Sequence, residues 1–425
     1  MLNKFISSLL VFVLLIIIGY IYNDFVLINY DYWLVKQDTI ISLYFMYLVP
    51  VFLNFFMSTE INKPSDFLAW IYFFLVVIPT VSLSPFLSND FYTGVISCAL
   101  VSIVALILLS ISKIPESKII PYVKGLSDFA MINLITVITF FFIIIIYFNY
   151  SFNLSKILDL SIFVDTYTIR SDFRDVKAGN SSIAGYAIFW LAKVLLPFYI
   201  CYGLAFNKRI FILLGLFLQL MIFSVSAHKS FIFSIILIFA IFLLLKTKAK
   251  FYQWIFSFTL FTIVSLVLYK FLNFNLLVDV FIRRAIITPG VLSNWWVNYF
   301  NNNKFANFEN SSLGVFFESN YQFAAPFVIG KHYFGSEWTS ANVNFATDAY
   351  GNAGWFAVFV FVFVLSIMLL IINKYSNISE RHFIFVVLLS VPTFWSLIET
   401  SFISVMVTHG LFLTVLIILF FRNKG

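Results

Sequence analysis

The chain has 425 residues, of which 62% are hydrophobic and only 11% charged, and its mean hydropathy is +1.00. A soluble domain normally carries about 25% charged residues, so this composition excludes an ordinary soluble protein. The net charge of +7 is first explained by contact with anionic headgroups, so membrane lipids are expected partners and nucleic acid is not. Cys98 and Cys201 both lie in apolar runs, which excludes a secreted disulfide framework.

Apolar runs recur along the whole chain and predict an all-α, polytopic integral membrane protein with about 12 transmembrane helices. No stretch outside these runs is long and mixed enough for a separate aqueous core, so we expect a single membrane domain over residues 1–425. The predicted spans are Phe5–Tyr22, Ile40–Met57, Phe67–Leu83, Gly94–Ile111, Phe129–Phe148, Ile183–Leu204, Ile210–Val225, Ser230–Leu245, Tyr252–Leu272, Gly354–Ile372, Phe383–Leu397 and Phe402–Phe421.

Basic residues predict the orientation of these spans. With both termini in the cytoplasm, fourteen of the 26 Lys and Arg residues fall in inner loops, whereas the short outer loops are nearly bare. We therefore expect a multi-pass membrane protein with both termini cytoplasmic.

The two longest outer loops, about residues 149–182 and 273–353, contain most of the remaining basic residues. Long loops follow the positive-inside rule less strictly than short ones. These basic residues are therefore either solvated charges without a specific role or part of an anion-binding site. Their many apolar and aromatic residues, such as Trp295, Trp296, Tyr299 and Phe300, favour structured loops at the membrane surface over disorder.

The first long loop contains Arg170 and Arg174, within the densest charged cluster of the chain. Arginine offers a planar fork of donors that suits phosphate oxygens, and a pyrophosphate is a natural ligand. The alternative is that both arginines pair with Asp172 and Asp175 or with lipid phosphates.

The second long loop contains Arg283 and Arg284, which we expect on a short interfacial helix ended by the turn Thr288-Pro289-Gly290. Adjacent helical residues point about 100° apart, so only one of the two is expected to face a cleft. The alternative is that both extend to lipid headgroups.

The same loop contains His332, its only histidine, and histidine suits proton abstraction near neutral pH. A surface or packing role is the alternative, and Glu318, Glu337 and Asp348 are competing bases. Asn342 and Asp348 belong to the polar, glycine-containing segment Ser340–Gly354, which is typical of a sugar site or of a helix entry capped by Asn352.

Lys193 lies some ten residues inside the sixth predicted span, and an ionisable group at that depth is a functional candidate that could equally snorkel or pair. His409 falls inside the last span, at the wrong depth for outer-face chemistry, and His228 at an outer turn is a weaker candidate. The sequence shows no metal-ligand spacing, no Walker-type loop and no dinucleotide motif, so we expect no metal and no cofactor. The substrate should then carry its own activated bond.

Over essentially its full length the chain resembles the Wzy-type O-antigen polymerases, or oligosaccharide repeat unit polymerases. Asp165, Arg170 and Arg174 before a span carry the resemblance, together with the Lys229 turn. The further features are Arg283-Arg284, Pro289-Gly290, Trp296 and Phe300, and then Ser340-Ala-Asn342, Asp348 and Gly351-Asn-Ala-Gly354. The family is described by an arginine followed by ten residues and a glycine in each large loop. Arg174 and Gly185 fit this spacing, whereas Arg283 and Arg284 lead to Asn294 and Trp295 instead.

The resemblance implies a glycosyltransferase of lipopolysaccharide or other polysaccharide biosynthesis whose active site faces the periplasm. Donor and acceptor would be oligosaccharides linked to undecaprenyl pyrophosphate, and a chain-length regulator protein is a further implied partner. Arg170, Arg174, Arg283, Arg284, Lys229, Asn342 and Asp348 would bind substrate, with His332 as catalytic base.

Three alternatives stay open from the sequence. An O-antigen ligase shares the architecture and the donor. A polysaccharide-lipid flippase or other transporter is expected to have more charged residues within its spans. A structural or channel-like membrane protein would leave the arginine-containing loops unexplained.

Overall fold

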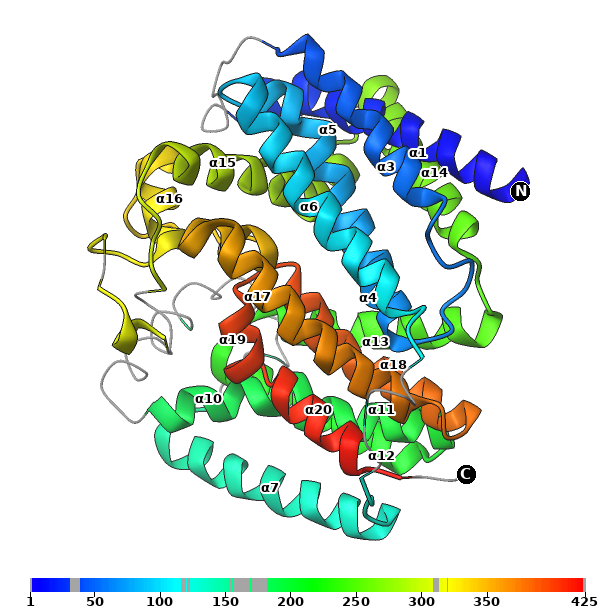
Figure 1. Cartoon of the computed structure of the whole chain (residues 1–425). Helices are drawn as coiled ribbons and strands as arrows, with labels where there is room; N and C mark the ends of the chain where they lie inside the picture. The colour runs from blue at the N-terminus through cyan, green and yellow to red at the C-terminus, as the bar shows by residue number, and fades with distance from the viewer. Residues whose placement is uncertain are drawn as a thin grey trace. The chain divides into compact units, whose positions relative to one another are not determined.

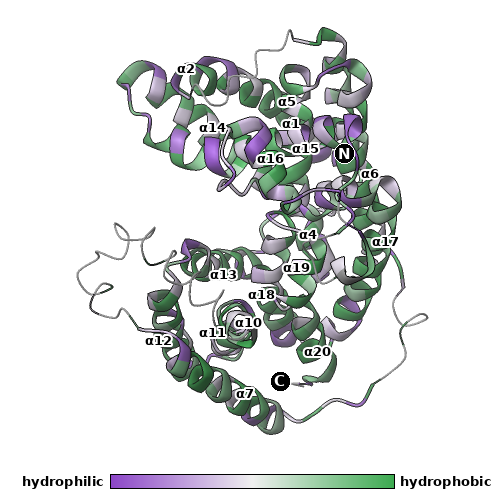
Figure 2. Ribbon diagram, turned by 90° about the vertical axis from the view of Figure 1, so that its left-hand side faces the viewer, coloured by the Kyte–Doolittle hydropathy of each residue, from purple (hydrophilic) through white to green (hydrophobic). Residues whose placement is uncertain are grey.

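The computed structural model describes residues 2–30, 39–115, 120, 123–152, 155, 157, 169, 182–308, 313–318 and 320–422. Most of these residues are helical, and the one β-bridge among them, between Leu126 and Phe421, belongs to no sheet. The predicted all-α fold is thus confirmed for the described part of the chain. Figure 2 shows that the long helices consist mainly of hydrophobic residues.

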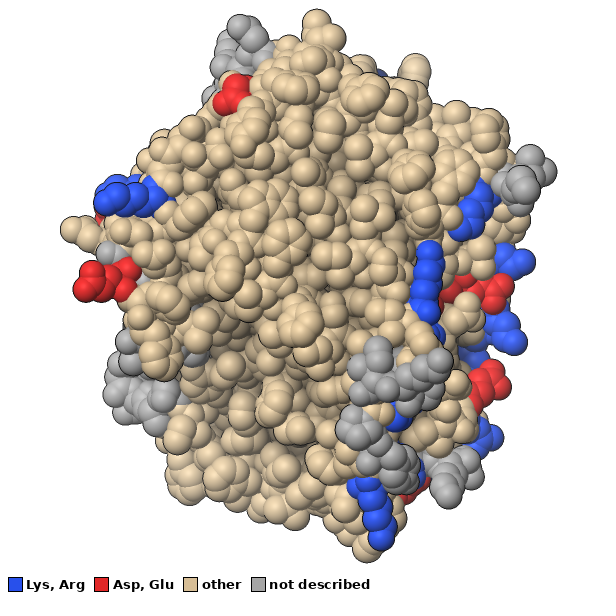
Figure 3. Space-filling model, in the orientation of Figure 1, with Lys and Arg blue, Asp and Glu red and all other residues tan. Residues whose placement is uncertain are grey.

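Nine helices among the described residues are long and apolar enough to cross a membrane. They correspond in order to the first predicted span and to the third through the tenth. The second predicted span is a shorter apolar helix, Ile41–Asn54, so the total of about 12 stays a prediction. Few charged side chains lie on the face drawn in Figure 3, as expected for a polytopic membrane protein.

The chain divides into two compact units. The first comprises Met1–Ile114, Ala249–Ile367 and Leu397–Ile403, and the second comprises Pro115–Lys248, Met368–Ser396 and Ser404–Gly425. The prediction of one integral membrane domain is not tested by this division.

The first unit contains α1 (Leu2–Ile21), η1 (Tyr22–Val26), α2 (Leu27–Asn29), η3 (Ile41–Tyr47), α3 (Leu48–Asn54), α4 (Pro64–Tyr72), η4 (Phe73–Val77), α5 (Ile78–Leu87), α6 (Phe91–Ile111), α14 (Phe251–Leu272), η8 (Val278–Ile287), α15 (Thr288–Asn302), η9 (Gly314–Phe316) and α16 (Ala325–Phe334) (Figure 1). Helix α17 (Phe345–Ser376) begins in this unit and ends in the second. The second unit contains α7 (Asp128–Asn149), α10 (Ser182–Trp190), η7 (Leu191–Leu195), α11 (Leu196–Phe206), α12 (Arg209–Ser226), α13 (Lys229–Thr247), nearly all of α18 (Glu380–Leu397), the end of α19 (Phe402–Val407) and α20 (Leu411–Phe420).

Helices are the expected form for these apolar runs, because a backbone in lipid must satisfy its polar groups within its own segment. Their ends follow local capping rules. The Asp90 carboxylate accepts a hydrogen bond from the Thr93 amide at 2.8 Å at the start of α6, and α11 ends at Asn207 in the left-handed conformation with φ of 57°.

The segment after α14 differs from the predicted loop, because much of it is helical and packs inside the first unit. The predicted turn at Thr288–Gly290 is wrong: the π-helical segment η8 runs directly into α15, so Pro289 lies within a continuous helical run, where the hydrogen-bond pattern changes from π to α. Helix α15 is held against α5, where the Asn294 amide donates to the Thr80 carbonyl at 3.0 Å and Asn298 donates to Leu87 at 2.6 Å (Figure 1).

The last predicted span, Phe402–Phe421, is not one helix. Helix α19 ends at Val407 and α20 begins at Leu411, with Gly410 between them at φ of +78°. Glycine adopts that left-handed conformation with the least strain, which suits it to the break, and the polar residues Thr408 and His409 directly precede it in a largely apolar run.

Candidate functional site

The C-terminal end of α16 carries the predicted base. Pro326 lies in the first turn of this helix, and Gly335 ends it with φ of +67°, a conformation suited to glycine. Lys331 and His332 therefore lie in the last turn, where basic side chains interact favourably with the helix dipole.

His332 lines an open pocket of about 560 Å³, a volume within the usual range for small-molecule sites. Three segments of the first unit build it: the end of α15, residues 320–323 and α16. The lining residues are Tyr299, Asn320, Tyr321, Gln322, Phe323, Val328, Lys331 and His332.

Aromatic contacts fix the wall of this pocket around the histidine. The Tyr299 ring meets the His332 ring edge-on at a centroid distance of 5.0 Å. The adjacent Tyr333 stacks on the fully buried Trp295 at 4.4 Å and 3°, so α16 is anchored to α15 directly beside the pocket.

Tyr321 forms a second aromatic wall and is itself tethered. Its hydroxyl donates to the Lys304 carbonyl at 2.5 Å, and its ring lies 6.2 Å from that of Tyr299. Burial raises the pKa of Tyr321 to about 12, so its hydroxyl stays protonated at neutral pH.

The residue types in the pocket suit a glycan. Aromatic faces stack on the apolar faces of sugar rings, and the amides of Asn320 and Gln322 can donate to and accept from hydroxyls. None of the described lining residues is acidic, so His332 is the general-base candidate within the lining. Lys331 adds a cation, which also pairs with Glu337 at 2.6 Å.

Arg283 and Arg284 have different environments, as adjacent helical residues should. Arg283 is 7% exposed, and its Nε donates to the Asp279 carboxylate at 2.5 Å while its guanidinium lies 4.2 Å from the centre of the Tyr30 ring. The Tyr30 hydroxyl donates to the same carboxylate oxygen. Arg284 is exposed. Arg283 is therefore held in a structural contact, and Arg284 is the better placed of the two to meet a ligand.

The charge state of this contact follows from its geometry. Burial acts to raise the pKa of the Asp279 carboxyl, but the hydrogen bonds from Tyr30 and Arg283 outweigh it, and the pKa lies below its usual value. Asp279 is thus ionised at neutral pH and neutralises Arg283.

Asp348 and Asn352 together hold a nearby segment of the same chain, at Phe308. Asp348 is 6% exposed and accepts a hydrogen bond from the Asn352 amide at 3.3 Å, while the Asn352 side-chain oxygen accepts from the Phe308 amide at 2.9 Å. The pair therefore holds the segment at Phe308, and α17 departs from helical geometry directly after it, at Ala353 and Gly354.

Asn342 and Lys229 are both exposed but do not line the His332 pocket. The Asn342 side chain accepts from the Ser340 hydroxyl at 3.1 Å. Lys229 is the first residue of α13 and belongs to the second unit. Arg170 and Arg174 lie outside the described residues.

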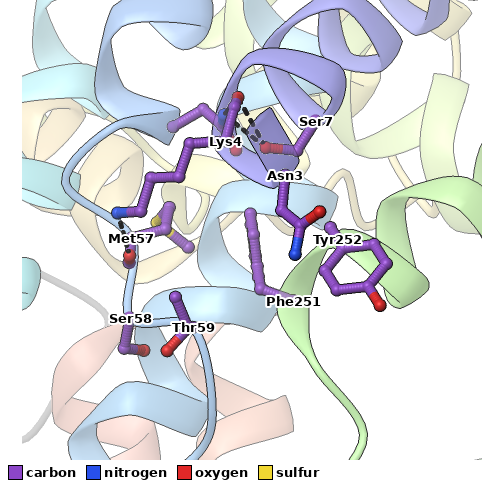
Figure 4. A pocket seen from close by; sticks show the side chains of 9 residues that line it. Asn3, Lys4, Ser7, Met57, Ser58, Thr59, Phe251 and Tyr252 are labelled. Atoms are coloured by element: carbon purple, nitrogen blue, oxygen red, sulfur yellow. Dashed lines mark hydrogen bonds between the residues drawn. The ribbon is translucent and has the colours of Figure 1, made fainter. Parts of the chain in front are cut away.

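A second pocket, near the start of α1, does not suit a sugar. It measures about 30 Å³, the space of a single water molecule. Lys4 extends along it toward Met57 and donates to the Met57 carbonyl at 2.9 Å (Figure 4). It also donates to the Phe55 carbonyl at 2.5 Å. This lysine ties α1 to the end of α3.

The sequence identifies His332 but not its neighbours in space. Asn320, Tyr321, Gln322 and Phe323 form an unbroken amide and aromatic run shortly before Pro326, which is the only local signal for the pocket. Tyr299 stands out in the sequence only as one of many loop aromatics.

Comparison with known proteins adds no relative. No family model matches the chain, and neither a curated protein nor a solved structure matches it. The residues of the site therefore carry the functional argument.

Proposed function

We propose that this protein is a membrane glycosyltransferase that joins lipid-linked oligosaccharide repeat units, with the acceptor glycan bound in the His332 pocket. The observation that supports this most directly is the composition of that pocket, in which aromatic rings, two amides, a lysine and a histidine converge. It is what an enzyme needs to hold a sugar and deprotonate one hydroxyl.

In the proposed reaction His332 takes the proton of the acceptor hydroxyl. The freed oxygen attacks the anomeric carbon of the donor sugar, and the bond from that carbon to the pyrophosphate oxygen breaks. The electron pair leaves with the undecaprenyl pyrophosphate. Arg284, together with Arg170 and Arg174 of the first long loop, would stabilise the charge on this leaving group.

The proposal places the site at the periplasmic face of the bacterial inner membrane, following the predicted topology. A chain-length regulator is the expected protein partner. The products would be O-antigen or capsular polysaccharide.

The decisive experiment supplies the purified full chain, in liposomes, with undecaprenyl-pyrophosphate-linked repeat units and separates the products on a gel. We expect a ladder of chain lengths. Tyr299→Ala removes the aromatic wall beside His332, and we expect it to weaken acceptor use and shorten the ladder. Tyr147→Ala, which removes an exposed tyrosine outside the pocket, is the matched control.

The alternatives give different patterns in the same assay. Transfer of a single glycan only to a lipid A core would indicate an O-antigen ligase. Movement of the lipid-linked glycan across the membrane without a new linkage would indicate a flippase. Transport is the second candidate because the second unit contains a buried lysine beside a broken helix.

A further inference from the structure

A salt bridge lies at the edge of the His332 pocket. Lys331 belongs to the pocket lining, and its Nζ lies 5.8 Å from the ring centre of Phe323, another lining residue. The same Nζ lies 2.6 Å from Oε1 of Glu337, which does not line the pocket. A carboxylate of the protein itself therefore contacts a cation that lies over one wall of the pocket.

The backbone after α16 brings Glu337 to this position. Gly335 ends the helix with φ of +67°, and the segment that follows packs on the helix. A Cβ at Gly330 would lie 1.8 Å from the carbonyl oxygen of Thr339, so only a glycine allows this close approach. The place of Glu337 beside the last turn of α16 is therefore set by the backbone, and the salt bridge is not needed to hold it.

The salt bridge is exposed to solvent. The side chains of Lys331 and Glu337 are 57% and 48% exposed. Exposed ion pairs contribute little to stability, because water screens the charges and two long side chains lose rotamer freedom. The pair can therefore open at small cost, and the carboxylate of a ligand can take the place of Glu337 on the ammonium group.

The charge of the pocket lining favours such a ligand. Lys331 is the one permanently charged residue among the described lining residues, and none of them is acidic. Stacking on aromatic rings and hydrogen bonds to Asn320 and Gln322 are sufficient for a neutral sugar. The lysine adds recognition of a negative group, and a charge-assisted hydrogen bond is stronger than a neutral one.

We infer that the pocket selects an acidic sugar, such as a uronic acid, whose carboxylate displaces Glu337 from Lys331. This inference rests on the proposed function, because it names the class of glycan that binds in the same pocket. Lys331 is then a specificity-determining residue. Glu337 is an internal competitor that occupies the ammonium group when no acidic sugar is bound.

The test compares two disaccharides that differ in one group. Cellobiouronic acid has a carboxylate where cellobiose has a hydroxymethyl group, and ligand-observed NMR titrations of the purified full chain in detergent measure the affinity for each. We expect wild type to bind the acid about fivefold more tightly and Lys331→Met to bind both equally. Lys208→Met, which removes an exposed lysine of the second unit, should keep the preference.

A second variant tests the displacement itself and does not depend on the folding of Lys331→Met. Glu337→Gln removes the competing carboxylate and keeps the lysine, so it should bind the acid about twofold more tightly than wild type, with the affinity for cellobiose unchanged. A salt bridge with a purely structural role predicts no such gain. Glu380→Gln, an exposed glutamate of the second unit, is the matched control and should behave as wild type.

The outcomes separate this inference from the proposed function. Equal affinity of wild type for the two disaccharides, or a preference retained by a folded Lys331→Met, overturns the selection of acidic sugars and leaves the pocket as a glycan site. The absence of a gain in Glu337→Gln overturns the displacement. Binding of neither disaccharide by wild type overturns the glycan pocket of the proposed function and this inference with it.

Discussion

The His332 pocket of the first unit and the contact between Lys193 and His409 in the second unit each pair a lysine with a histidine, yet they are built in opposite ways. Lys331 and His332 are adjacent in sequence, exposed, and placed by the last turn of α16. Lys193 and His409 are 216 residues apart, and the lysine is buried. The exposed pair depends on local helix geometry, whereas the buried pair depends on a helix break and on long-range packing. We therefore expect substitutions in the exposed pair to lower activity with little loss of stability, and substitutions at the helix break to lower stability.

The largest expected effect is on catalysis at the exposed pair. His332→Gln should lower the transfer rate by about 10²–10⁴-fold, the usual contribution of a general base. Because His332 is exposed, the thermal midpoint should stay nearly unchanged. Transfer rates and thermal unfolding of the same preparation measure both effects, and a fully active variant would remove His332 from the reaction.

Two glycines test the structural side of the comparison. Gly410→Ala combines a left-handed backbone with a contact to Val194, so strain and crowding should destabilise the protein by about 2–4 kcal/mol. Gly335→Ala, which follows the exposed pair, has the same strain at φ of +67° but no neighbour within 4 Å, so about 1 kcal/mol is expected. Thermal unfolding measures both. Equal losses would show that the packing at the break is loose.

Arg283 and Arg284 repeat the contrast between buried and exposed cations within one helical turn. Arg283→Met leaves the Asp279 carboxylate without its charged partner and should cost about 2 kcal/mol of stability. Arg284→Met should have the same thermal midpoint as wild type within the measurement error. It should slow transfer if this residue contacts the leaving group. The reverse pattern would contradict the roles assigned to the two residues.

The smallest expected effect is the pH dependence of the Asp279 contact. The folded-state pKa of Asp279 is lower than its unfolded value, so the contact stabilises the protein above the unfolded pKa. This contribution is lost as the pH falls through the folded pKa. The difference in thermal midpoint between wild type and Asp279→Asn should therefore be constant from about pH 8 to 5 and shrink below about pH 4. A difference that grows on acidification would show the opposite linkage.

The sequence by itself determined the helical segments. Nine predicted spans correspond to helices of spanning length, because each is fixed by its own apolar run and by hydrogen bonds within the segment. It also singled out His332 and the unequal positions of Arg283 and Arg284, since helical geometry separates adjacent side chains.

Only the tertiary structure decided which side chains share a site. Tyr299 and residues 320–323 join His332 through the stacking of α16 on α15, and no local pattern specifies that contact. The run Thr408-His409-Gly410 is a local signal for the break, but the apolar residues on both sides of it predict a single span. Burial of α15 and of Lys193 likewise follows from packing between segments far apart in the chain, which composition and periodicity do not encode.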